Sequence, residues 1–159
     1  MPTPLRVYCP GPEAPTTTEL LAFARARGRA LQPYEAYGYD DPGARDWDSL
    51  GLLWRPDRPP LFVELERPEG PDGRHVSQAI LAAKRAIASL PPSPARDEAA
   101  RRLAATTFVA AIQVPIDGTD DAAWAAAEAL AACFEERAQG VTEVLGRGFV
   151  LAGAPLTAS

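Results

Sequence analysis

The nine residues from Thr107 to Pro115, ThrPheValAlaAlaIleGlnValPro, constrain the fold more than any other part of this 159-residue chain. Both alternating sets of side chains in this segment are largely apolar, which is the pattern of a strand in the middle of a sheet. Pro115 ends the strand, because proline has no N–H group to donate to a neighbouring strand. The sequence therefore predicts a sheet with this segment at its centre.

A helix and a hairpin are predicted to follow this central strand. Residues 119–121, ThrAspAsp, offer an N-cap and first-turn acids, and Leu130 and Phe134 then lie on one apolar helical stripe. Gly140 ends the helix. Residues 141–152, with GlyArgGly in the middle, are typical of two short strands joined by a turn. The segment as a whole predicts a strand–helix–strand unit.

A second strand–helix–strand unit is predicted near the start of the chain. It consists of a strand from Leu5 to Cys9, a helix from about Thr17 and a strand from about Leu31 to Gly38. Thr16 and Glu19 have the spacing of a capping box, which favours a helix start at this point. Two such units in one chain suit a sheet covered by helices, as in ferredoxin-like folds.

The middle of the chain is predicted to contain a hairpin and two helices. Residues 50–54 and 61–67 form the hairpin, and residues 76–90 form a helix whose apolar side chains step by three and four positions. Ser93 caps the next helix, with Pro94 at its first position. Seven side chains from the predicted central strand and long helices are expected in the core: Ile80, Ile87, Phe108, Ile112, Trp124, Leu130 and Phe134.

These patterns predict an α+β fold with a single domain over residues 1–153 and a flexible C-terminal tail over residues 154–159. The expected architecture is a mixed β-sheet with helices packed mainly on one face. Two ferredoxin-like halves would be one way to arrange the two strand–helix–strand units.

The composition limits the partners of the chain. With 47% hydrophobic and 23% charged residues it resembles a soluble globular protein, and a formal charge of -5 opposes binding to nucleic acid or to an anionic membrane. No apolar run approaches the roughly 20 residues that a membrane span needs, and the N-terminus lacks the order of a signal peptide. We therefore expect a cytoplasmic protein. The absence of asparagine and the single lysine, Lys84, are typical of a GC-rich bacterial genome.

Neither a metal nor a cofactor is expected. His75, Cys9 and Cys133 are too scattered to form a closed zinc site. The loop from Asp40 to Asp48 has several carboxylates, but it lacks the spacing, the central glycine and the final glutamate of an EF-hand. Residues 146–151 begin like a dinucleotide fingerprint, yet no third glycine and no helix follow.

An enzyme that uses carboxylates and tyrosine is the alternative that stays open. Glu64 and Glu66 lie on one face of a predicted strand and could form an acid/base pair of a small hydrolase or isomerase. Apolar side chains on the other face, such as Val63, give the pattern of any half-buried strand. Whether this pair, or the loop from Asp40 to Asp48, belongs to an active site is left open.

The leading hypothesis is a non-catalytic protein-interaction domain, such as an adaptor, a regulator or a toxin-neutralising partner. The region from Tyr34 to Arg58 gathers tyrosine, tryptophan and arginine, the residue types enriched at binding hot spots, among several aspartates. The predicted binding residues are Tyr37, Tyr39, Arg45 and Trp47. The acidic surroundings suit a partner with a basic surface.

Two other interpretations of this region remain. The aromatic side chains could pack on the sheet while the acids are solvated in a turn. Alternatively, the same patch could join two copies of the chain about a two-fold axis. A concave site with converging acids, tyrosines and arginines would favour the enzyme, and an exposed aromatic patch would favour the binding domain.

Overall fold

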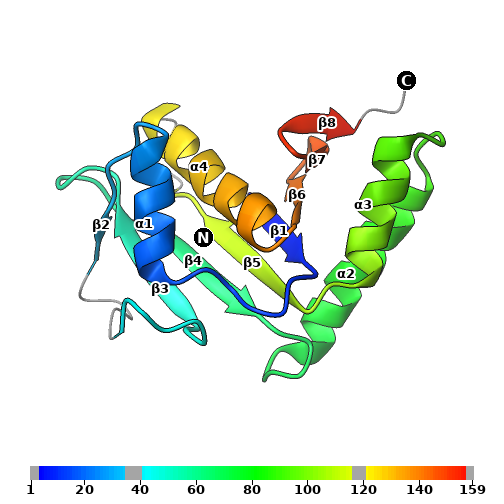
Figure 1. The fold of residues 1–159 in the computed structure, drawn as a ribbon, viewed down its shortest axis with the longest axis horizontal. Coiled ribbons are helices and arrows are strands. Elements are labelled where there is room, and N and C mark those ends of the chain that lie inside the picture. The colour runs from blue at the N-terminus through cyan, green and yellow to red at the C-terminus, as the bar shows by residue number, and fades with distance from the viewer. Residues whose placement is uncertain (1–3, 35–40, 116–120, 157–159) are drawn as a thin grey trace.

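The computed structural model describes residues 4–34, 41–115 and 121–156, which form four helices and eight strands in a single-domain α+β fold (Figure 1). The strands are β1 (Leu5–Cys9), β2 (Gln32–Pro33), β3 (Ser49–Leu53), β4 (Leu61–Glu66), β5 (Phe108–Gln113), β6 (Val141–Val144), β7 (Gly148–Leu151) and β8 (Ala154–Leu156). The helices are α1 (Thr17–Ala26), α2 (Gly73–Ala88), α3 (Pro94–Ala104) and α4 (Asp121–Arg137). None of the helices in these ranges combines the length and the apolar character that crossing a bilayer demands.

All strands belong to one sheet with the order β2-β3-β4-β5-β1-β6-β7-β8. Phe108–Gln113 lies near its centre, as predicted, and pairs with β1 on one side and with β4 on the other. Every pairing between the described strands is antiparallel, which corrects the prediction of a mixed sheet. The reason is that the two strands of each predicted strand–helix–strand unit are separated by other strands. Between β5 and β6, for example, β1 is inserted.

The unit β5-α4-β6 is therefore a split β-α-β arrangement, a building block of ferredoxin-like folds. In the other unit, three strands (β3, β4 and β5) separate β1 from β2. Because these strands continue one sheet without a division, two ferredoxin-like halves are not confirmed.

Helices cover both faces of the sheet, which corrects the prediction that they pack mainly on one face. Val7 and Ala110 lie in the core shared with α1 and α4, whereas their neighbours Tyr8 and Val109 lie in a second core shared with α2 and α3. The physical reason is that β1 and β5 are apolar on both sides, so each side must be shielded from water. Figure 1 shows α1 and α4 across the front of the sheet and the α2–α3 pair to the right.

The predicted helix caps are confirmed at two helices. Thr16 Oγ1 accepts a hydrogen bond of 3.1 Å from the backbone N–H of Glu19 at the start of α1. Ser93 Oγ accepts one of 3.0 Å from the N–H of Arg96, and Pro94 occupies the first position of α3. Each cap satisfies a backbone donor that has no partner within its helix.

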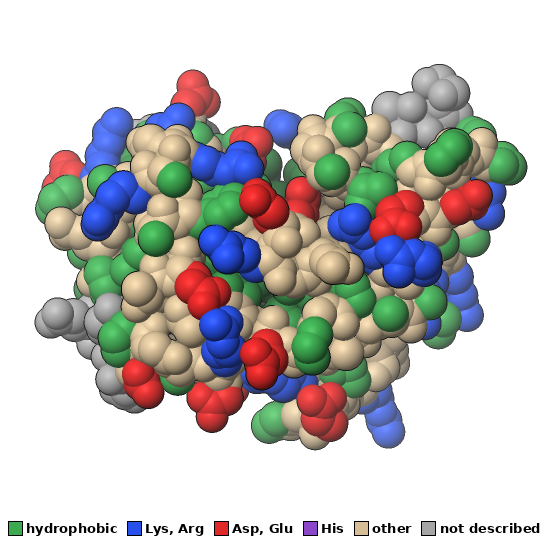
Figure 2. Space-filling view, viewed as in Figure 1, with side chains coloured by type: hydrophobic (Ala, Val, Ile, Leu, Met, Phe, Trp, Pro, Cys, Tyr) green, Lys and Arg blue, Asp and Glu red, His purple; other side chains and the backbone are tan. Residues whose placement is uncertain are grey.

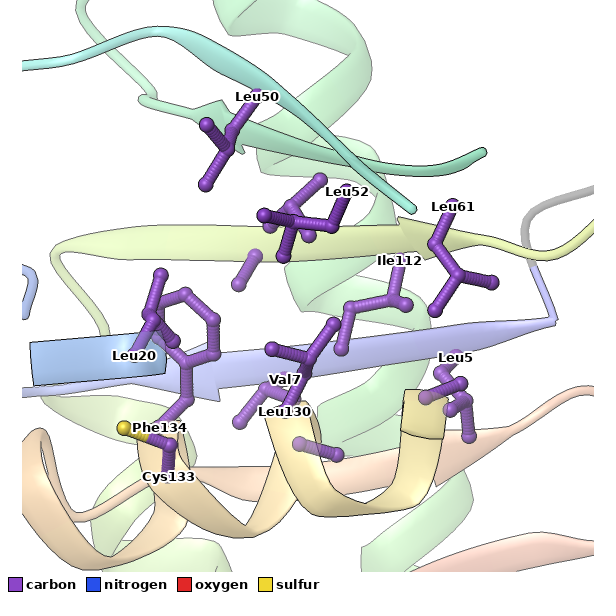
Figure 3. Packing of buried hydrophobic residues seen from close by; sticks show 14 of the residues in the cluster. Leu5, Val7, Leu20, Leu50, Leu52, Leu61, Ile112, Leu130, Cys133 and Phe134 are labelled. Carbon is purple, nitrogen blue, oxygen red and sulfur yellow. The ribbon is translucent and has the colours of Figure 1, made fainter. Parts of the chain in front are cut away.

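The larger core lies between the sheet and the helices α1 and α4 (Figure 3). Phe134 of α4 is fully buried, and its ring meets that of Phe108 edge to face at 6.5 Å between centroids. Apart from Trp124, the side chains expected in the core are buried as predicted. Trp124 is the correction: it is only half-buried, because it sits where α4 reaches the edge of the core and faces a surface groove.

The strands at the two edges of the sheet, β2 and β8, have bounds that differ from the predicted ones. The strand expected from Leu31 to Gly38 is restricted to Gln32–Pro33 within the described residues, and residues 35–40 lie outside them. The tail expected from residue 154 begins with an ordered strand instead, because Ala154–Leu156 pairs with β7 after a turn at Gly153, where φ is +81°. Glycine adopts this left-handed conformation without a steric penalty.

Both cysteines lie in the larger core, and we expect them to be unreactive in the folded protein. Burial raises the pKa of the Cys133 thiol to about 12 and holds that of Cys9 well above its usual value. Because the thiolate is the reacting species, labelling by an aromatic disulfide reagent at about pH 8 should be slower than in urea-denatured protein by at least about 100-fold. Equal labelling rates in both states would contradict the buried positions.

Candidate functional site

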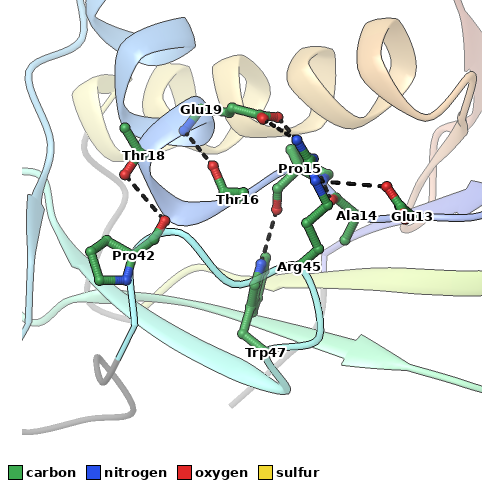
Figure 4. A network of polar contacts seen from close by, with 9 residues as sticks. All are labelled: Glu13, Ala14, Pro15, Thr16, Thr18, Glu19, Pro42, Arg45 and Trp47. Carbon is green, nitrogen blue, oxygen red and sulfur yellow. Dashed lines mark hydrogen bonds and ion pairs between the residues drawn. The ribbon is translucent and has the colours of Figure 1, made fainter.

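The structure describes part of the predicted binding region. Arg45 and Trp47 lie in the segment that precedes β3, whereas Tyr37 and Tyr39 lie outside the described residues, as does Asp40. Arg45 is exposed and Trp47 is half-buried. Both side chains contact the segment that leads into α1, which places residues 41–47 against the start of that helix (Figure 4).

Arg45 contacts three residues, two in this segment and one in the first turn of α1. Its Nη2 lies 2.6 Å from Glu19 Oε1, its Nη1 donates to the carbonyl oxygen of Ala14 at 3.2 Å, and its Nε lies 3.6 Å from Glu13 Oε2. The hydrogen bonds from Arg45 lower the pKa of Glu19, which also lies in the first turn of α1 where a negative charge is favourable. Arg45 therefore joins the loop to the helix.

Trp47 contributes to the same attachment. Its indole Nε1 donates a hydrogen bond of 2.9 Å to the carbonyl oxygen of Pro15, and its ring packs against the larger core. Nearby, the backbone N–H and the hydroxyl of Thr18 both donate to the carbonyl oxygen of Pro42 at 3.1 Å. We call residues 41–47 the brace, because these contacts fix the loop in front of β3 on α1.

Beyond the brace, the predicted region ends in the β3–β4 hairpin, whose tip is exposed. Trp54 Nε1 donates to the carbonyl oxygen of Pro59 at 3.1 Å across the tip. The guanidinium of Arg55 lies over the Trp54 ring, 5.3 Å from its centroid. We call the following residues the hairpin surface: Tyr34, Trp54, Arg55, Asp57 and Arg58.

Glu64 and Glu66 lie on the sheet face opposite α1 and α4 and line a shallow depression of about 330 Å³. Asp48 and Arg67 line it too, and their side chains meet at 3.3 Å. Partial burial raises the pKa of Glu66, and the neighbouring Glu64 raises it further. That Glu64 and Glu66 act as an acid/base pair, as the enzyme alternative requires, remains a prediction.

A larger concave site lies at the other end of the sheet, where the sequence predicted no function. It is a groove of about 540 Å³ between α4 and the strands β6, β7 and β8. We call it the α4 groove. Its walls include an aromatic ring, three arginines, two glutamates and the edge of the sheet: Trp124, Arg27, Arg29, Arg147, Glu128, Glu135, Thr142, Val150 and Pro155.

Charged side chains lie toward both ends of the α4 groove. The guanidinium of Arg147 lies 5.6 Å from the centroid of the Trp124 ring, near the N-terminal end of α4. Arg27 lies at the other end, where its Nη2 is 3.6 Å from Glu136 Oε2. Within the described part of the chain, Arg29 and Arg147 have no carboxylate within ion-pair distance.

Glu135 connects the two walls of the groove. Its carboxylate accepts hydrogen bonds from the hydroxyl of Thr142 on β6 and from the backbone N–H of Gly153 before β8. Burial raises the pKa of Glu135. The carboxyl group therefore holds α4 against the β6–β8 strands.

This pKa shift predicts how the stability depends on pH. Because Glu135 holds its proton more tightly when folded, its contribution is complete below the unfolded pKa and is lost as the pH rises through the folded pKa. In Glu135→Gln, whose amide stays uncharged throughout this pH range, the free energy of unfolding should therefore rise relative to wild type between about pH 4 and about pH 7. Urea denaturation at both pH values measures this difference. If the free energy of unfolding of the variant instead falls relative to wild type as the pH rises over this range, the surroundings of Glu135 stabilise its charged form and the prediction is wrong.

Comparisons with protein-family models, with curated proteins and with solved structures find no match for this chain. Within residues 4–34, 41–115 and 121–156, no three side chains of histidine, cysteine, aspartate or glutamate are grouped so that they could hold a metal ion. The hairpin surface, the brace and the α4 groove are the candidate functional features of the described residues.

Proposed function

We propose that the protein is a non-catalytic protein-interaction domain that binds its partner through the hairpin surface. The observation that carries this proposal is the Trp54–Arg55 pair of the β3–β4 hairpin, in which Arg55 is exposed and the Trp54 ring is half-buried against the larger core. The bond from Trp54 to Pro59 and the stacking of Arg55 limit the motion of both side chains before any partner arrives. Ordered side chains lose less entropy on binding, so such a pair suits a hot spot.

The brace gives Arg45 and Trp47 a supporting role in this proposal. Their contacts run to Ala14, Pro15 and Glu19 rather than outward, so they hold the segment before β3 in place. Direct contact with the partner is assigned to the hairpin tip and to Tyr34, which is 36% exposed.

The charge of the region supports a basic partner surface. Asp41, Asp46, Asp48 and Asp57 are all exposed, and the whole chain carries a net charge of -5. The hairpin surface itself carries two arginines and one aspartate, so the attraction to a positively charged protein comes from the aspartates of the preceding segment and from the net charge of the chain, and salt weakens it. A second copy of the chain would bring like charges together, so we favour a different protein as the partner.

The experiment is affinity capture from the native host with the wild-type chain and with Trp54→Ala/Arg55→Ala. The double variant should reduce recovery of the specific partner at least about 10-fold, since the loss of hot-spot residues costs about 2 kcal/mol or more. Because the half-buried Trp54 ring packs against the larger core, circular dichroism melting curves establish that the double variant is folded before capture. Capture should weaken as the salt concentration rises.

Two matched controls sharpen the result. Leu145→Ala and Lys84→Ala change exposed residues on the β6–β7 turn and on α2, and both should capture the partner as the wild type does. Undiminished capture by Trp54→Ala/Arg55→Ala would overturn the proposal. Light scattering of the isolated protein distinguishes self-association, which would give a dimer that the double variant disrupts.

The supporting role of the brace gives a separate stability prediction. Trp47→Phe keeps most of the ring packing but removes the N–H group that donates to Pro15. The free energy of unfolding should fall by about 0.5 to 1.5 kcal/mol, the net value of a typical hydrogen bond. Urea denaturation measures the change, and an unchanged midpoint would show that the bond does not hold the loop.

A further inference from the structure

We propose that the α4 groove binds a small organic dianion, a molecule with an apolar middle and a carboxylate or phosphate group at each end. This inference is independent of the proposed function, because the hairpin surface and the groove are built from strands at opposite ends of the sheet. The volume of about 540 Å³ lies within the range of about 300 to 1,000 Å³ for small-molecule sites. Figure 2 shows the hollow between the α1–α4 side and the β7–β8 side, with charged side chains at its rim.

The positions of the arginines indicate the charge and the length of the ligand. Arg147 lies near Trp124 and Arg27 lies near Glu136, so the groove has a guanidinium toward each end of α4. At a rise of 1.5 Å per residue, these two ends of the helix are about 18 Å apart. Long arginine side chains shorten this span, so an extended molecule could meet both. Guanidinium groups bind carboxylate and phosphate oxygens through paired hydrogen bonds.

The free hydrogen-bonding capacity of the arginines favours an anion. Arg29 and Arg147 lack a carboxylate partner within the described residues, although the chain is acidic overall. The carboxylate of Glu135 accepts bonds from Thr142 and Gly153. Its oxygens are therefore engaged by the protein, which leaves Arg29 and Arg147 available to a ligand, whereas Arg27 would exchange its contact with Glu136 for one with the ligand.

The floor of the groove favours an apolar middle in the ligand. Ala125, Ala129 and Ala132 lie on the groove side of α4, where their small side chains leave space against the sheet. Val144 and Val150 contribute apolar surface from β6 and β7. A chain of methylene groups could displace water from these walls at about 0.8 kcal/mol per buried group.

The probes for the experiment are the linear dicarboxylates adipate, suberate and sebacate, with octanoate as the monocarboxylate control and an aspartate-rich peptide as the macromolecular alternative. Isothermal titration should show that the best dicarboxylate binds at least about 10-fold tighter than octanoate, because its second carboxylate meets a second guanidinium. Equal affinity for octanoate and all three dicarboxylates would overturn the proposal, as would binding of the peptide alone.

Two variants and one control test whether the dicarboxylate binds in the α4 groove. Arg29→Gln/Arg147→Gln should weaken dicarboxylate binding at least about 10-fold. Ala132→Leu should block it by filling the floor while keeping every charge. Arg74→Gln, an exposed arginine at the start of α2, is the matched control and should bind as the wild type does.

The same titrations separate this inference from the proposed function. Trp54→Ala/Arg55→Ala should bind the dicarboxylate with unchanged affinity, since these residues lie outside the groove. Circular dichroism melting curves establish that each variant is folded before titration. If folded Arg29→Gln/Arg147→Gln and folded Ala132→Leu both bind the dicarboxylate as tightly as wild type, the groove is not the binding site.

Discussion

Replacing Phe134 with alanine should lower the free energy of unfolding by about 3 to 5 kcal/mol, the usual cost of truncating a buried aromatic side chain. Phe134 is fully buried between α4 and the sheet, and it meets Phe108 edge to face with an interplanar angle of 68°. The truncation removes apolar contacts and leaves a cavity that α4 cannot fill without shifting. Urea denaturation followed by circular dichroism measures the loss.

The control for this prediction is Leu145→Ala on the β6–β7 turn. Leu145 is 63% exposed, so its truncation should change the free energy of unfolding by less than about 0.5 kcal/mol. A similar small loss in Phe134→Ala would mean that α4 presents a different face to the sheet.

Adding a methyl group at position 140 should also destabilise the protein, by about 1 to 3 kcal/mol. A Cβ atom built on Gly140 would clash with Val7 Cγ1 and lie 3.3 Å from Cys9 Sγ. Val7 is fully buried in the central part of the sheet and is stiff at χ1, so it has little room to move. The free energy of unfolding of Gly140→Ala, measured in urea, tests this close approach.

A double-mutant cycle identifies the clash as the cause. Val7→Ala removes the methyl group that the new side chain would meet, so Gly140→Ala should cost less in the Val7→Ala background than in the wild type. Purely additive effects of the two substitutions would mean that Gly140 is required for another reason, such as the local backbone conformation.

Local sequence signals predicted the elements well because these signals are themselves local. The capping residues Thr16 and Ser93 mark where α1 and α3 begin, and the hairpin strands β3 and β4 lie close to their predicted positions. The order of the strands could not be predicted in this way. The insertion of β1 between β5 and β6 depends on pairing between segments more than 90 residues apart in the chain.

The distribution of the helices was mispredicted for a related reason. The apolar stripe of α2 showed that this helix packs on the sheet, but a stripe does not say which face it meets. The apolar side chains on both faces of β5 indicate helices on both faces of the sheet. With Phe108 on one side and Val109 on the other, each side must be shielded from water.

No local sequence pattern predicts the α4 groove, because the residues that form it are far apart in the sequence. Arg29 follows α1, Trp124 lies in the first turn of α4 and Arg147 lies in the GlyArgGly turn, which by itself indicates only a hairpin. The helical position of Trp124 predicts a place in the core, but the N-terminal end of α4 extends to the margin of the core. The ring is consequently half-buried and forms part of the groove wall.

The hairpin surface combines predicted and unpredicted features. The region from Tyr34 to Arg58 was selected for its aromatic and arginine content, and the structure divides its described part into a brace and an exposed tip. Composition could not separate these roles, because a tryptophan that donates to Pro15 and one that donates to Pro59 look alike in sequence.

Hydrogen–deuterium exchange of the protein with its captured partner tests the central claim, recognition through the hairpin surface, most directly. Binding should slow amide exchange in the β3–β4 hairpin and beside Tyr34, while exchange in α2 and α4 stays unchanged. Protection confined to α4 and the β6–β8 strands, with the hairpin exchanging as in the free protein, would contradict the account.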